Sequence, residues 1–391
     1  MKHRIVVLGA GYAGAVAAGR LAGRLYRDEV SVTLVNGEAD FVERVRMHEL
    51  ATGRDLKPRP FEDMYAGTGV VLKLATVTGV DVDRKTVALG ADELEYDTLV
   101  YALGSGWNPQ GVPGVAEHAY EIASRPGALR LRERLASLAA GQSVTVVGAG
   151  LTGVEFATEL AESRPDLDVA IAVAGELGDW LSPKGRRHLR KVFGGLGITV
   201  HEHAAVARVD ADQVTTADGT SIPAAVTVWT AGFAVHPIAA ATGLEVTDTG
   251  RIVVDGTMRS VSHPDVYAIG DAAFAIGAKN KPLRMSCASS QPMAWQAADS
   301  IAARLTGGKL PHAPLAYFNQ CISLGRKNGL VQYVTTDDRA VNAALTGRVA
   351  AVYKELICKG AAFGVEKPLL GLPVRRRHVL ATVAPVKEWT S

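Results

Sequence analysis

The sequence predicts an α/β protein with two parallel sheets flanked by helices, and two observations lead to this prediction. A buried strand, a glycine-rich turn and an alanine-rich helix follow one another twice. The first copy reads Arg4-Ile-Val-Val-Leu-Gly-Ala-Gly-Tyr-Ala-Gly14 and the second reads Ser143-Val-Thr-Val-Val-Gly-Ala-Gly-Leu-Thr-Gly153. The chain of 391 residues is also long enough for two or three domains, and its 48% hydrophobic content is typical of globular proteins.

The pattern of apolar residues predicts the remaining elements in chain order. In the first unit a helix is expected at 15–25 and strands at 30–35, 70–77, 86–89 and 98–103. The second unit is expected to contain helices at 125–138 and 154–162 and strands at 168–173, 198–203 and 225–229. A strand at 251–254, a strand-rich piece from residue 313 and a helix at 349–358 complete the prediction.

Composition excludes several classes of protein. The 42 basic and 40 acidic side chains give a net charge of +2, which provides no strong field for a nucleic acid. Three cysteines exclude a disulfide-stapled secreted scaffold and favour the reducing cytoplasm. The basic start and the apolar run after it imitate a secretory signal, but Gly9, Gly11 and Gly14 suit a tight turn better. No apolar window reaches about 18 residues, so we expect no membrane span.

The two glycine motifs indicate phosphate binding. The first glycine of each motif allows a tight turn, the second lets backbone approach a pyrophosphate, and the third permits close helix packing. The helix then offers its free N–H groups and the positive end of its dipole. The glycines are Gly9, Gly11 and Gly14 in the first copy and Gly148, Gly150 and Gly153 in the second. The alternative is a pair of glycine turns without a ligand.

The residue after the second strand of each unit should bind the ribose hydroxyls, and an acid is usual there. Asn36 occupies this place in the first copy, with Glu38 two residues on, and asparagine still hydrogen-bonds a hydroxyl. Ala174 occupies it in the second copy, which removes the group that favours NADH over NADPH. Arg186 and Arg187 lie further on and are also explained as solvated helix charges.

Three more positions support the same organisation. Two strands end in small-residue turns at Gly104 and Gly232, and such turns close one dinucleotide unit and lead to the next. Asp271 follows an apolar strand and a glycine, where its carboxylate could accept hydrogen bonds from a ribityl chain. The alternative for Asp271 is an N-cap of the helix after it.

In this order the motifs resemble the two-dinucleotide-binding-domain flavoproteins, also called the pyridine nucleotide-disulfide oxidoreductase superfamily, over roughly residues 3–310. The resemblance implies two Rossmann-like domains, with an NAD(P)-binding domain inserted in an FAD-binding domain, and a small C-terminal α+β domain. The implied ranges are 1–112 and 241–312 for FAD, 113–240 for NAD(P) and 313–391 for the last domain. Pro113-Gly114 lies at the first of these boundaries.

The resemblance also implies site residues. The first glycine triplet would bind the FAD pyrophosphate, Asn36 the adenosine ribose, Val77 the adenine through its backbone, and Asp271 the ribityl-phosphate region. The second triplet would bind NAD(P)H. Further residues beside these motifs are assigned to cofactor binding: Tyr12, Ala13, Arg44, Gly104, Thr152, Gly232 and Pro292. No metal ligand is assigned.

Within the superfamily the chain is most similar to the type II NADH:quinone oxidoreductases, in the segment from Phe41 to Gly53 and in the second glycine motif. That branch places a glutamate, here Glu155, near the nicotinamide and the flavin, where it could orient the carboxamide or relay a proton. The alternative is a glutamate that only favours the helix dipole.

The quinone motif of the branch, Ala-Gln-x-Ala-x-Gln, corresponds to Ser290-Gln-Pro-Met-Ala-Trp-Gln296. Pro292 replaces the first glutamine, and Gln291 stands one residue earlier as its expected substitute. Gln291 and Gln296 are therefore assigned, with Glu155, to catalysis. A plain helix opening with a proline is the alternative.

The cysteines argue against related chemistries. Disulfide-active members carry Cys-x-x-x-x-Cys in the helix expected from Glu43 to Leu50, which has no cysteine here, so a disulfide relay is excluded on this resemblance. A pair of the sulfide:quinone reductase kind would have to come from Cys287, Cys321 and Cys358. Buried apolar thiols are the simpler interpretation of all three.

We therefore expect a cytoplasmic enzyme that transfers hydride from NAD(P)H to FAD and then two electrons to a quinone-like small acceptor. The alternatives are an FAD enzyme of an organic metabolite with a weakened nicotinamide site, a reductase for a protein electron acceptor, and a non-enzymatic nucleotide sensor. The basic run from Arg375 to Arg377 is either a solvated tail or a weak contact with anionic lipid at the inner face of the cell membrane, at about 1 kcal/mol per charge. A homodimer through the last domain is implied by the resemblance alone.

Overall fold

The computed structural model describes residues 1–311, 314–367 and 375–380. Its first sheet is parallel and has the strand order β19-β7-β1-β2-β3. These strands are β1 (His3–Leu8), β2 (Val30–Asn36), β3 (Val70–Leu74), β7 (Thr98–Tyr101) and β19 (Val266–Ala268). The whole second sheet forms between β7 and β19 along the chain, so the second domain is inserted in the first, as the sequence predicted.

The second sheet repeats this construction with the order β12-β11-β10-β16-β9, again parallel. Its strands are β9 (Ala119–Tyr120), β10 (Ser143–Val147), β11 (Asp168–Ala172), β12 (Thr199–His201) and β16 (Val226–Trp229). In both sheets the strand of the glycine motif lies between the next strand along the chain and a later one. This shared topology confirms the prediction of two Rossmann-like domains.

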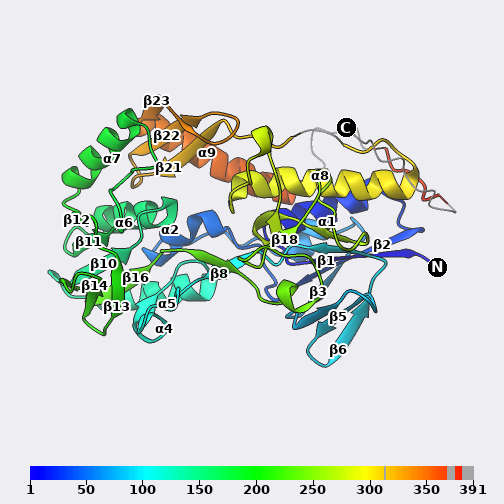
Figure 1. Cartoon of the computed structure of the whole chain (residues 1–391), viewed down its shortest axis with the longest axis horizontal. Helices are drawn as coiled ribbons and strands as arrows, with labels where there is room; N and C mark the ends of the chain where they lie inside the picture. The colour runs from blue at the N-terminus through cyan, green and yellow to red at the C-terminus, as the bar shows by residue number, and fades with distance from the viewer. Residues whose placement is uncertain (312–313, 368–374, 381–391) are drawn as a thin grey trace.

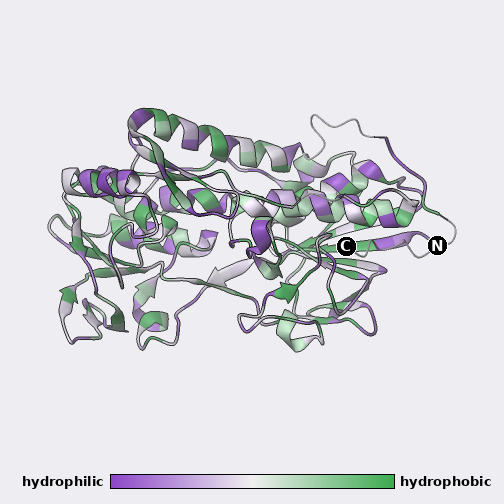
Figure 2. Ribbon diagram, turned by 45° about the horizontal axis from the view of Figure 1, so that its top comes forward, coloured by the Kyte–Doolittle hydropathy of each residue, from purple (hydrophilic) through white to green (hydrophobic). Residues whose placement is uncertain are grey.

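Helices flank both sheets. The longer ones are α1 (Tyr12–Arg24), α5 (Arg125–Ala136), α6 (Leu151–Ser163), α7 (Pro183–Gly195) and α8 (Cys287–Thr306). The short ones are η1 (Arg44–Arg46), α2 (Met47–Ala51), α3 (Phe61–Tyr65), α4 (Val115–His118), η2 (Ala239–Ala241), η3 (Gly270–Ala272) and η4 (Ala278–Asn280). In Figure 2 the helices carry both green and purple residues, which is expected when only one face of a helix packs inwards.

Small additional sheets lie outside the two main sheets. One consists of β4 (Gly79–Asp81), β5 (Thr86–Leu89) and β6 (Asp92–Glu95), and another of β13 (Val206–Val209), β14 (Gln213–Thr216) and β15 (Ser221–Pro223). A parallel pair joins β18 (Ile252–Val253) to β20 (Ala273–Phe274). The chain leaves the first domain through β8 (Ser105–Trp107) and returns through β17 (Phe233–Val235), and these two strands pair antiparallel.

The C-terminal part is α+β. It contains the antiparallel strands β21 (Asn319–Ser323), β22 (Gly329–Val334) and β23 (Ala340–Thr346), followed by α9 (Gly347–Glu366). Figure 1 shows these strands above the second sheet, beside α7, while α9 extends back towards the first domain. The small last domain of the prediction is therefore present, whereas the boundaries proposed between domains stay predictions.

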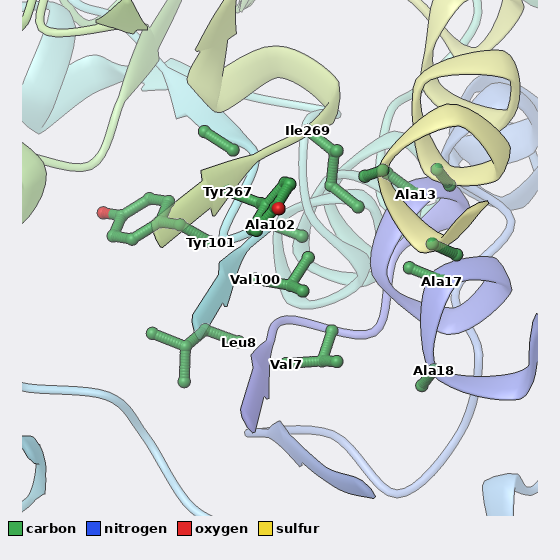
Figure 3. Packing of buried hydrophobic residues seen from close by; sticks show 14 of the residues in the cluster. Val7, Leu8, Ala13, Ala17, Ala18, Val100, Tyr101, Ala102, Tyr267 and Ile269 are labelled. Atoms are coloured by element: carbon green, nitrogen blue, oxygen red, sulfur yellow. The ribbon is translucent and has the colours of Figure 1, made fainter. Parts of the chain in front are cut away.

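The core of the first domain lies between its sheet and the pair α1 and α8 (Figure 3). Val7 and Leu8 of β1 are fully buried, and Ala17 and Ala18 of α1 face the sheet with no exposed surface. Alanine at these positions lets α1 approach both the strands and α8 closely. The close approach fixes the start of α1, and with it the first glycine turn.

The observed elements differ from the predicted ones mainly at their ends. The strand predicted at 70–77 ends at Leu74, because its partner β2 ends at Asn36 and no strand is left to pair with. The helix predicted to open at the quinone motif begins earlier, at Cys287, so that Pro292 lies inside α8 rather than at its start. None of the helices in the described residues is long and apolar enough to cross a membrane. In the same part of the chain, no cluster of His, Cys, Asp and Glu is suited to hold a metal ion.

Candidate active site

The first glycine turn is shaped by contacts that exclude side chains. Gly9 has a φ of +88°, and a Cβ added to it would lie 2.5 Å from the Ala102 carbonyl oxygen. A Cβ on Gly14 would lie 1.8 Å from the Gly9 carbonyl oxygen, whereas one on Gly11 would meet no atom within 4 Å. Gly9 and Gly14 are therefore required by packing, and Gly11 faces open space.

The second turn repeats this geometry. Gly148 has a φ of +102° and would place a Cβ 2.9 Å from the Ala231 Cα, while a Cβ on Gly153 would lie 1.9 Å from the Gly148 carbonyl oxygen. Gly150 again faces open space. Gly11 and Gly150 are the N-caps of α1 and α6, and neither helix has a side-chain cap or an acid in its first turn. Two helix ends thus keep free N–H groups over a cleared space, which fits a dinucleotide pyrophosphate at each.

Asn36 lies at the end of β2, beside the first glycine turn. Its side-chain oxygen accepts a hydrogen bond from the Ala10 N–H at 2.9 Å, and its amide donates to the Glu38 carbonyl at 2.8 Å. The side chain therefore braces the turn, and its contact with a ribose stays a prediction. Val77 is buried just beyond β3, and its backbone contact with adenine also stays a prediction.

Arg44, Gly104 and Asp271 come together from three separate segments. The Ser105 hydroxyl donates to the Asp271 carboxylate at 2.7 Å, and the Arg44 guanidinium donates to the Ser105 carbonyl at 2.8 Å. Arg44 also lies 3.8 Å from the Asp271 carboxylate, and Gly104 has a φ of +71° beside it. Both contacts use the same Asp271 oxygen, and the other accepts no hydrogen bond from the described residues. The assignment of Asp271 to a flavin side chain fits this arrangement and stays a prediction. Sequence reasoning missed Ser105.

Tyr12 and Ala13 begin α1 at the same place. A Cβ on Gly270, the residue before Asp271, would lie 3.2 Å from the Ala13 Cβ, so the start of α1 abuts the Asp271 turn. The Tyr12 ring packs edge-on against Phe41 at 4.9 Å, and its hydroxyl is buried without a hydrogen-bond partner among the described residues. Burial raises the pKa of Tyr12 well above its usual value of 10.0. An unpartnered buried hydroxyl next to the cleared space fits a polar cofactor.

Glu155 faces away from the glycine turn towards the C-terminal part of the chain. Its carboxylate lies 2.9 Å from the Lys354 ammonium of α9 and accepts a hydrogen bond of 2.9 Å from the Ser323 N–H of β21. The two charged side chains are only 8% and 14% exposed. The helix-dipole interpretation of Glu155 does not explain this pairing, because the carboxylate forms an ion pair with a separate helix.

The ion pair sets the charge state of both groups. Burial raises the pKa of Glu155, but Lys354, His48 and the Ser323 N–H together lower it by more, so the net pKa lies below 4.5. Burial lowers the pKa of Lys354, and the Glu155 carboxylate reverses this, so the net pKa lies well above 10.5. Both groups are therefore charged at neutral pH. Lys354 was missed in the sequence, where the one available signal was a lysine within the apolar helix predicted at 349–358.

The structure does not bring Gln291 and Gln296 into the network around Glu155. The Gln291 amide donates to the Ala361 carbonyl of α9 at 2.7 Å, and the buried Gln296 amide donates to the Gly256 carbonyl. Each glutamine thus stabilises the packing of α8, and their catalytic assignment stays a prediction. Pro292 lacks an N–H inside α8, so the carbonyl of Ala288 has no helical donor.

The remaining nicotinamide-side residues, Thr152 and Gly232, flank the second glycine turn, and their contacts with a nucleotide stay predictions. Thr152 is in the first turn of α6, and Gly232 has a φ of +140° at the end of the turn that follows β16. Arg186 lies in α7 and pairs with Glu176 at 2.6 Å, while Arg187 is exposed. The described ion pairs of α7 thus support the interpretation of Arg186 as a helix charge, and no 2′-phosphate contact is indicated.

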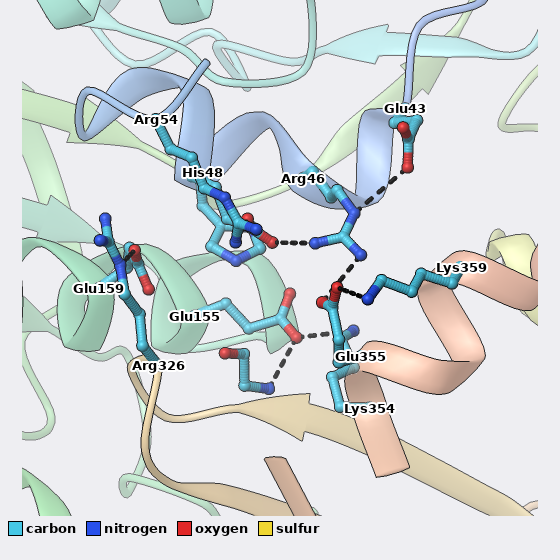
Figure 4. Close-up of polar contacts among 12 residues, drawn as sticks. Glu43, Arg46, His48, Arg54, Glu155, Glu159, Arg326, Lys354, Glu355 and Lys359 are labelled. Atoms are coloured by element: carbon cyan, nitrogen blue, oxygen red, sulfur yellow. Dashed lines mark hydrogen bonds and ion pairs between the residues drawn. The ribbon is translucent and has the colours of Figure 1, made fainter. Parts of the chain in front are cut away.

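A buried network of charges joins the segment after β2 to α9 (Figure 4). The Arg46 guanidinium, with a side chain 6% exposed, contacts the carboxylates of Glu43 at 3.2 Å, Glu49 at 2.7 Å and Glu355 at 2.8 Å. Glu355 is the neighbour of Lys354 on α9. The network therefore holds α9 in the position from which Lys354 reaches Glu155.

The three cysteines are free thiols. Burial raises the pKa of each, that of Cys358 to about 12. Since the thiolate is the reactive form, these groups are poor nucleophiles at neutral pH. The interpretation of all three as buried thiols therefore fits the structure better than a catalytic cysteine pair.

Comparisons with known proteins identify the family. Residues 3–302 match the pyridine nucleotide-disulphide oxidoreductase family. An NADH dehydrogenase-like protein of Mycobacterium tuberculosis is 31% identical over 317 residues, which cover 74% of this chain and 78% of that protein. The type II NADH:quinone oxidoreductase of Staphylococcus epidermidis is 26% identical over 393 residues, covering 90% and 96%.

Solved structures agree on the fold. The sulfide:quinone oxidoreductase of Aquifex aeolicus superposes with a TM-score of 0.80 at 19% identity, covering 99% of this chain and 100% of that one. At this identity the likeness concerns the fold alone. The relatives confirm the similarity to the type II branch that the sequence predicted. The chain belongs to the pyridine nucleotide-disulphide oxidoreductase family, and it is an oxidoreductase with FAD and a nicotinamide nucleotide as its cofactors.

Proposed function

We propose that the protein transfers hydride from NAD(P)H to FAD and then two electrons to a quinone-like small acceptor. The observation that carries the proposal is the pair of open glycine turns, one in each domain, with the Glu155–Lys354 ion pair joining the nicotinamide-side helix α6 to α9. The names of the quinone-reducing relatives support the choice of acceptor class.

The residues of this chain divide the work. The N–H groups at the starts of α1 and α6 hold the two pyrophosphates, and Asp271, supported by Ser105, orients the flavin side chain. Bound FAD supplies the capacity to accept hydride and release it as two electrons. The Glu155 carboxylate is kept ionised by Lys354 at the contact between α6 and α9. There it can position the nicotinamide or pass on a proton.

Anaerobic mixing of the holoenzyme with NADH or NADPH tests the proposal. We expect the flavin absorbance to bleach in the stopped flow with at least one nucleotide, and a soluble quinone to restore it. Ala174 leaves the choice of nucleotide open, because its methyl group binds neither a ribose hydroxyl nor a 2′-phosphate. Indifference to both nucleotides would favour an enzyme of an organic metabolite instead, and reoxidation only by a protein carrier would favour a protein acceptor.

We also propose that the protein contacts a lipid surface through α9 rather than through the basic tail. Residues at successive turns of α9 leave large apolar side chains in solvent: Val349 is 65% exposed, Val352 55%, Leu356 61% and Phe363 47%. The end of the basic run instead lies against the first domain, where the backbone of Arg377 forms a parallel β-bridge with that of Leu25. An apolar acceptor dissolves in a bilayer, so this face would bring the enzyme to it.

Replacing Leu356 and Phe363 by glutamate should release the protein from lipid. Burying such a side chain contributes about 1.5–3 kcal/mol, so partition into vesicles with anionic lipid should fall by about tenfold or more for each substitution. Flotation with the vesicles measures the partition. Val71→Glu is the matched control, because Val71 is 57% exposed on β3 and lies outside α9. Equal partition of the double variant and the control would contradict the assignment.

A further inference from the structure

A cavity of about 490 Å³ lies beside Lys354, between α2, α6, β21 and α9. Its wall includes side chains from each of these elements and from the loop after β21: His48, Glu49, Arg54, Glu159, Ser323, Arg326, Lys354, Glu355 and Cys358. Arg54 and Arg326 are about half exposed, which opens the cavity to solvent at one side. Lys354, at the other side, contacts the Glu155 carboxylate. The cavity therefore connects solvent with the buried ion pair.

His48 is the basic group in this wall that has no hydrogen-bond partner among the described residues. The residue is 5% exposed, and its Nε2 is buried without a hydrogen bond to any described atom. Figure 4 shows its ring pointing from α2 towards Glu155, with Arg54 on the other side. A buried polar nitrogen without a partner is costly, so its presence at this position needs an explanation.

The charged groups around His48 are already matched with one another. Arg54 contacts Glu49 beside α2, Arg326 contacts Glu159 of α6 at 2.7 Å, and Lys354 contacts Glu155 at 2.9 Å. Glu355 of α9 pairs with Arg46 at 2.8 Å, and the Cys358 thiol is held neutral by burial. Each carboxylate of this set is therefore paired with another cation, and none among the described residues forms an ion pair with His48. The imidazole is thus the basic wall group that forms no ion pair with a described carboxylate.

The proposed reaction requires such a group. NAD(P)H delivers one hydride, which carries two electrons and one proton, whereas a quinone takes up two electrons and two protons to become a quinol. The balanced reaction is NAD(P)H + H⁺ + quinone → NAD(P)⁺ + quinol. One proton per turnover must therefore reach the buried site from solvent, and histidine exchanges protons near neutral pH more readily than other side chains.

We propose that His48 carries this proton from the solvent-connected cavity to the Glu155–Lys354 pair, from which it reaches the acceptor. The inference rests on the proposed function and adds the route of proton entry to it. The imidazole takes a proton on the cavity side and passes it to the Glu155 carboxylate, which releases it to the acceptor and is ionised again. The ring is then neutral and ready for the next turnover. His48 acts through Glu155 and is a relay residue, not a residue that touches the substrate.

The test separates proton delivery from nucleotide chemistry. Holoenzyme reduced by a stoichiometric amount of dithionite is mixed with a soluble quinone, and reoxidation is followed from pH 5 to 9. We expect His48→Ala to slow reoxidation by about 100-fold, the lower end of general acid–base effects, and to enlarge the solvent deuterium isotope effect. Added imidazole should restore the rate in a saturable way, since the cavity and the vacated side-chain volume admit it.

A second readout does not depend on turnover. Calorimetry and crystals soaked in imidazole should show the ring bound beside Glu155 in His48→Ala and not in the unchanged protein. His188→Ala is the matched control, because the Nε2 of His188 in α7 is also buried without a hydrogen bond to the described part of the chain, but His188 lies outside the cavity. It should reoxidise at the normal rate.

The outcomes distinguish the two proposals. An unchanged reoxidation rate in His48→Ala overturns the relay, and so does a slow rate with a normal isotope effect and no rescue by imidazole, because that result indicates a structural role. Failure of both nucleotides to bleach the flavin of the unchanged protein overturns the proposed function. The dithionite experiment still decides the relay in that case, since it requires no nucleotide.

Discussion

Gly11→Val is expected to give a folded protein without FAD, whereas Gly150→Val is expected to keep its FAD and lose reduction by NAD(P)H. Both glycines have extended backbone angles that valine also adopts, with φ of −71° at Gly11 and −69° at Gly150. An added Cβ meets no protein atom within 4 Å at either position. Loss of nucleotide binding in either variant must therefore come from a clash between the valine side chain and the nucleotide that occupies this space.

The expected effect of each substitution is large. A branched side chain at the closest approach of backbone to pyrophosphate should raise the dissociation constant of that nucleotide by at least about 100-fold, equivalent to about 2.8 kcal/mol. Absorbance of the purified protein measures FAD content, and stopped-flow bleaching measures the nicotinamide site. Gly194→Val, at the exposed end of α7 where a Cβ also meets open space, controls for the loss of a glycine. A yellow Gly11→Val protein that NAD(P)H still reduces would refute the assignment of the first turn.

Lys354→Met should lower the free energy of unfolding by about 3–5 kcal/mol at pH 7, because it leaves the Glu155 carboxylate buried without its cation. Glu155→Gln should destabilise the protein for the converse reason and slow flavin reduction while FAD stays bound. The double variant, which buries no unpaired charge, should recover most of the stability but not the rate. Urea denaturation and the stopped flow measure the two quantities.

The pH dependence of stability gives an independent check on the pair. The pKa of Glu155 is depressed in the folded protein, so its contribution is present above the unfolded value near 4.5 and is lost as the pH falls through the folded pKa. The pKa of Lys354 is raised, so its contribution is present below 10.5 and is lost as the pH rises through the folded pKa. The double variant should lose both dependences, and a pH profile equal to that of the unchanged protein would contradict the ion pair.

The sequence predicted most of the fold because both sheets are built from local signals. The strand predicted at 86–89 matches β5, and the two glycine motifs fixed β1, α1, β10 and α6 to within a few residues. It missed the pair β8 and β17, because three-residue strands carry too few residues for a pattern and pair across a long stretch of chain. The sequence indicated α7 only through Arg186 and Arg187, because the many basic residues of this helix obscure the spacing of its apolar residues.

The candidate site was predictable where a ligand dictates the residues and not where the protein's own partners do. Gly11, Gly150 and Asp271 stand in motifs, and the two glycines face open space at the N-termini of α1 and α6. Their contacts with the cofactors stay predictions. Lys354 belongs to no motif, and His48 stands in the segment from Phe41 to Gly53 without an assigned role. Their places in the site depend on the packing of α2 against α6 and on the ion pair from α9 to Glu155. Such a cluster is visible only when distant segments are seen together.

The position of Lys354 in the chain has a consequence for biosynthesis. Its carboxylate partner emerges from the ribosome 199 residues earlier. At 5–20 residues per second, roughly 10–40 s pass between the two events. During that interval the inserted domain has no cation with which to bury Glu155, so this face of the nascent chain must stay hydrated or take up a proton. Formation of the Glu155–Lys354 ion pair is then among the last steps of folding. A polypeptide released before α9 is made would have both glycine turns but no cation beside Glu155.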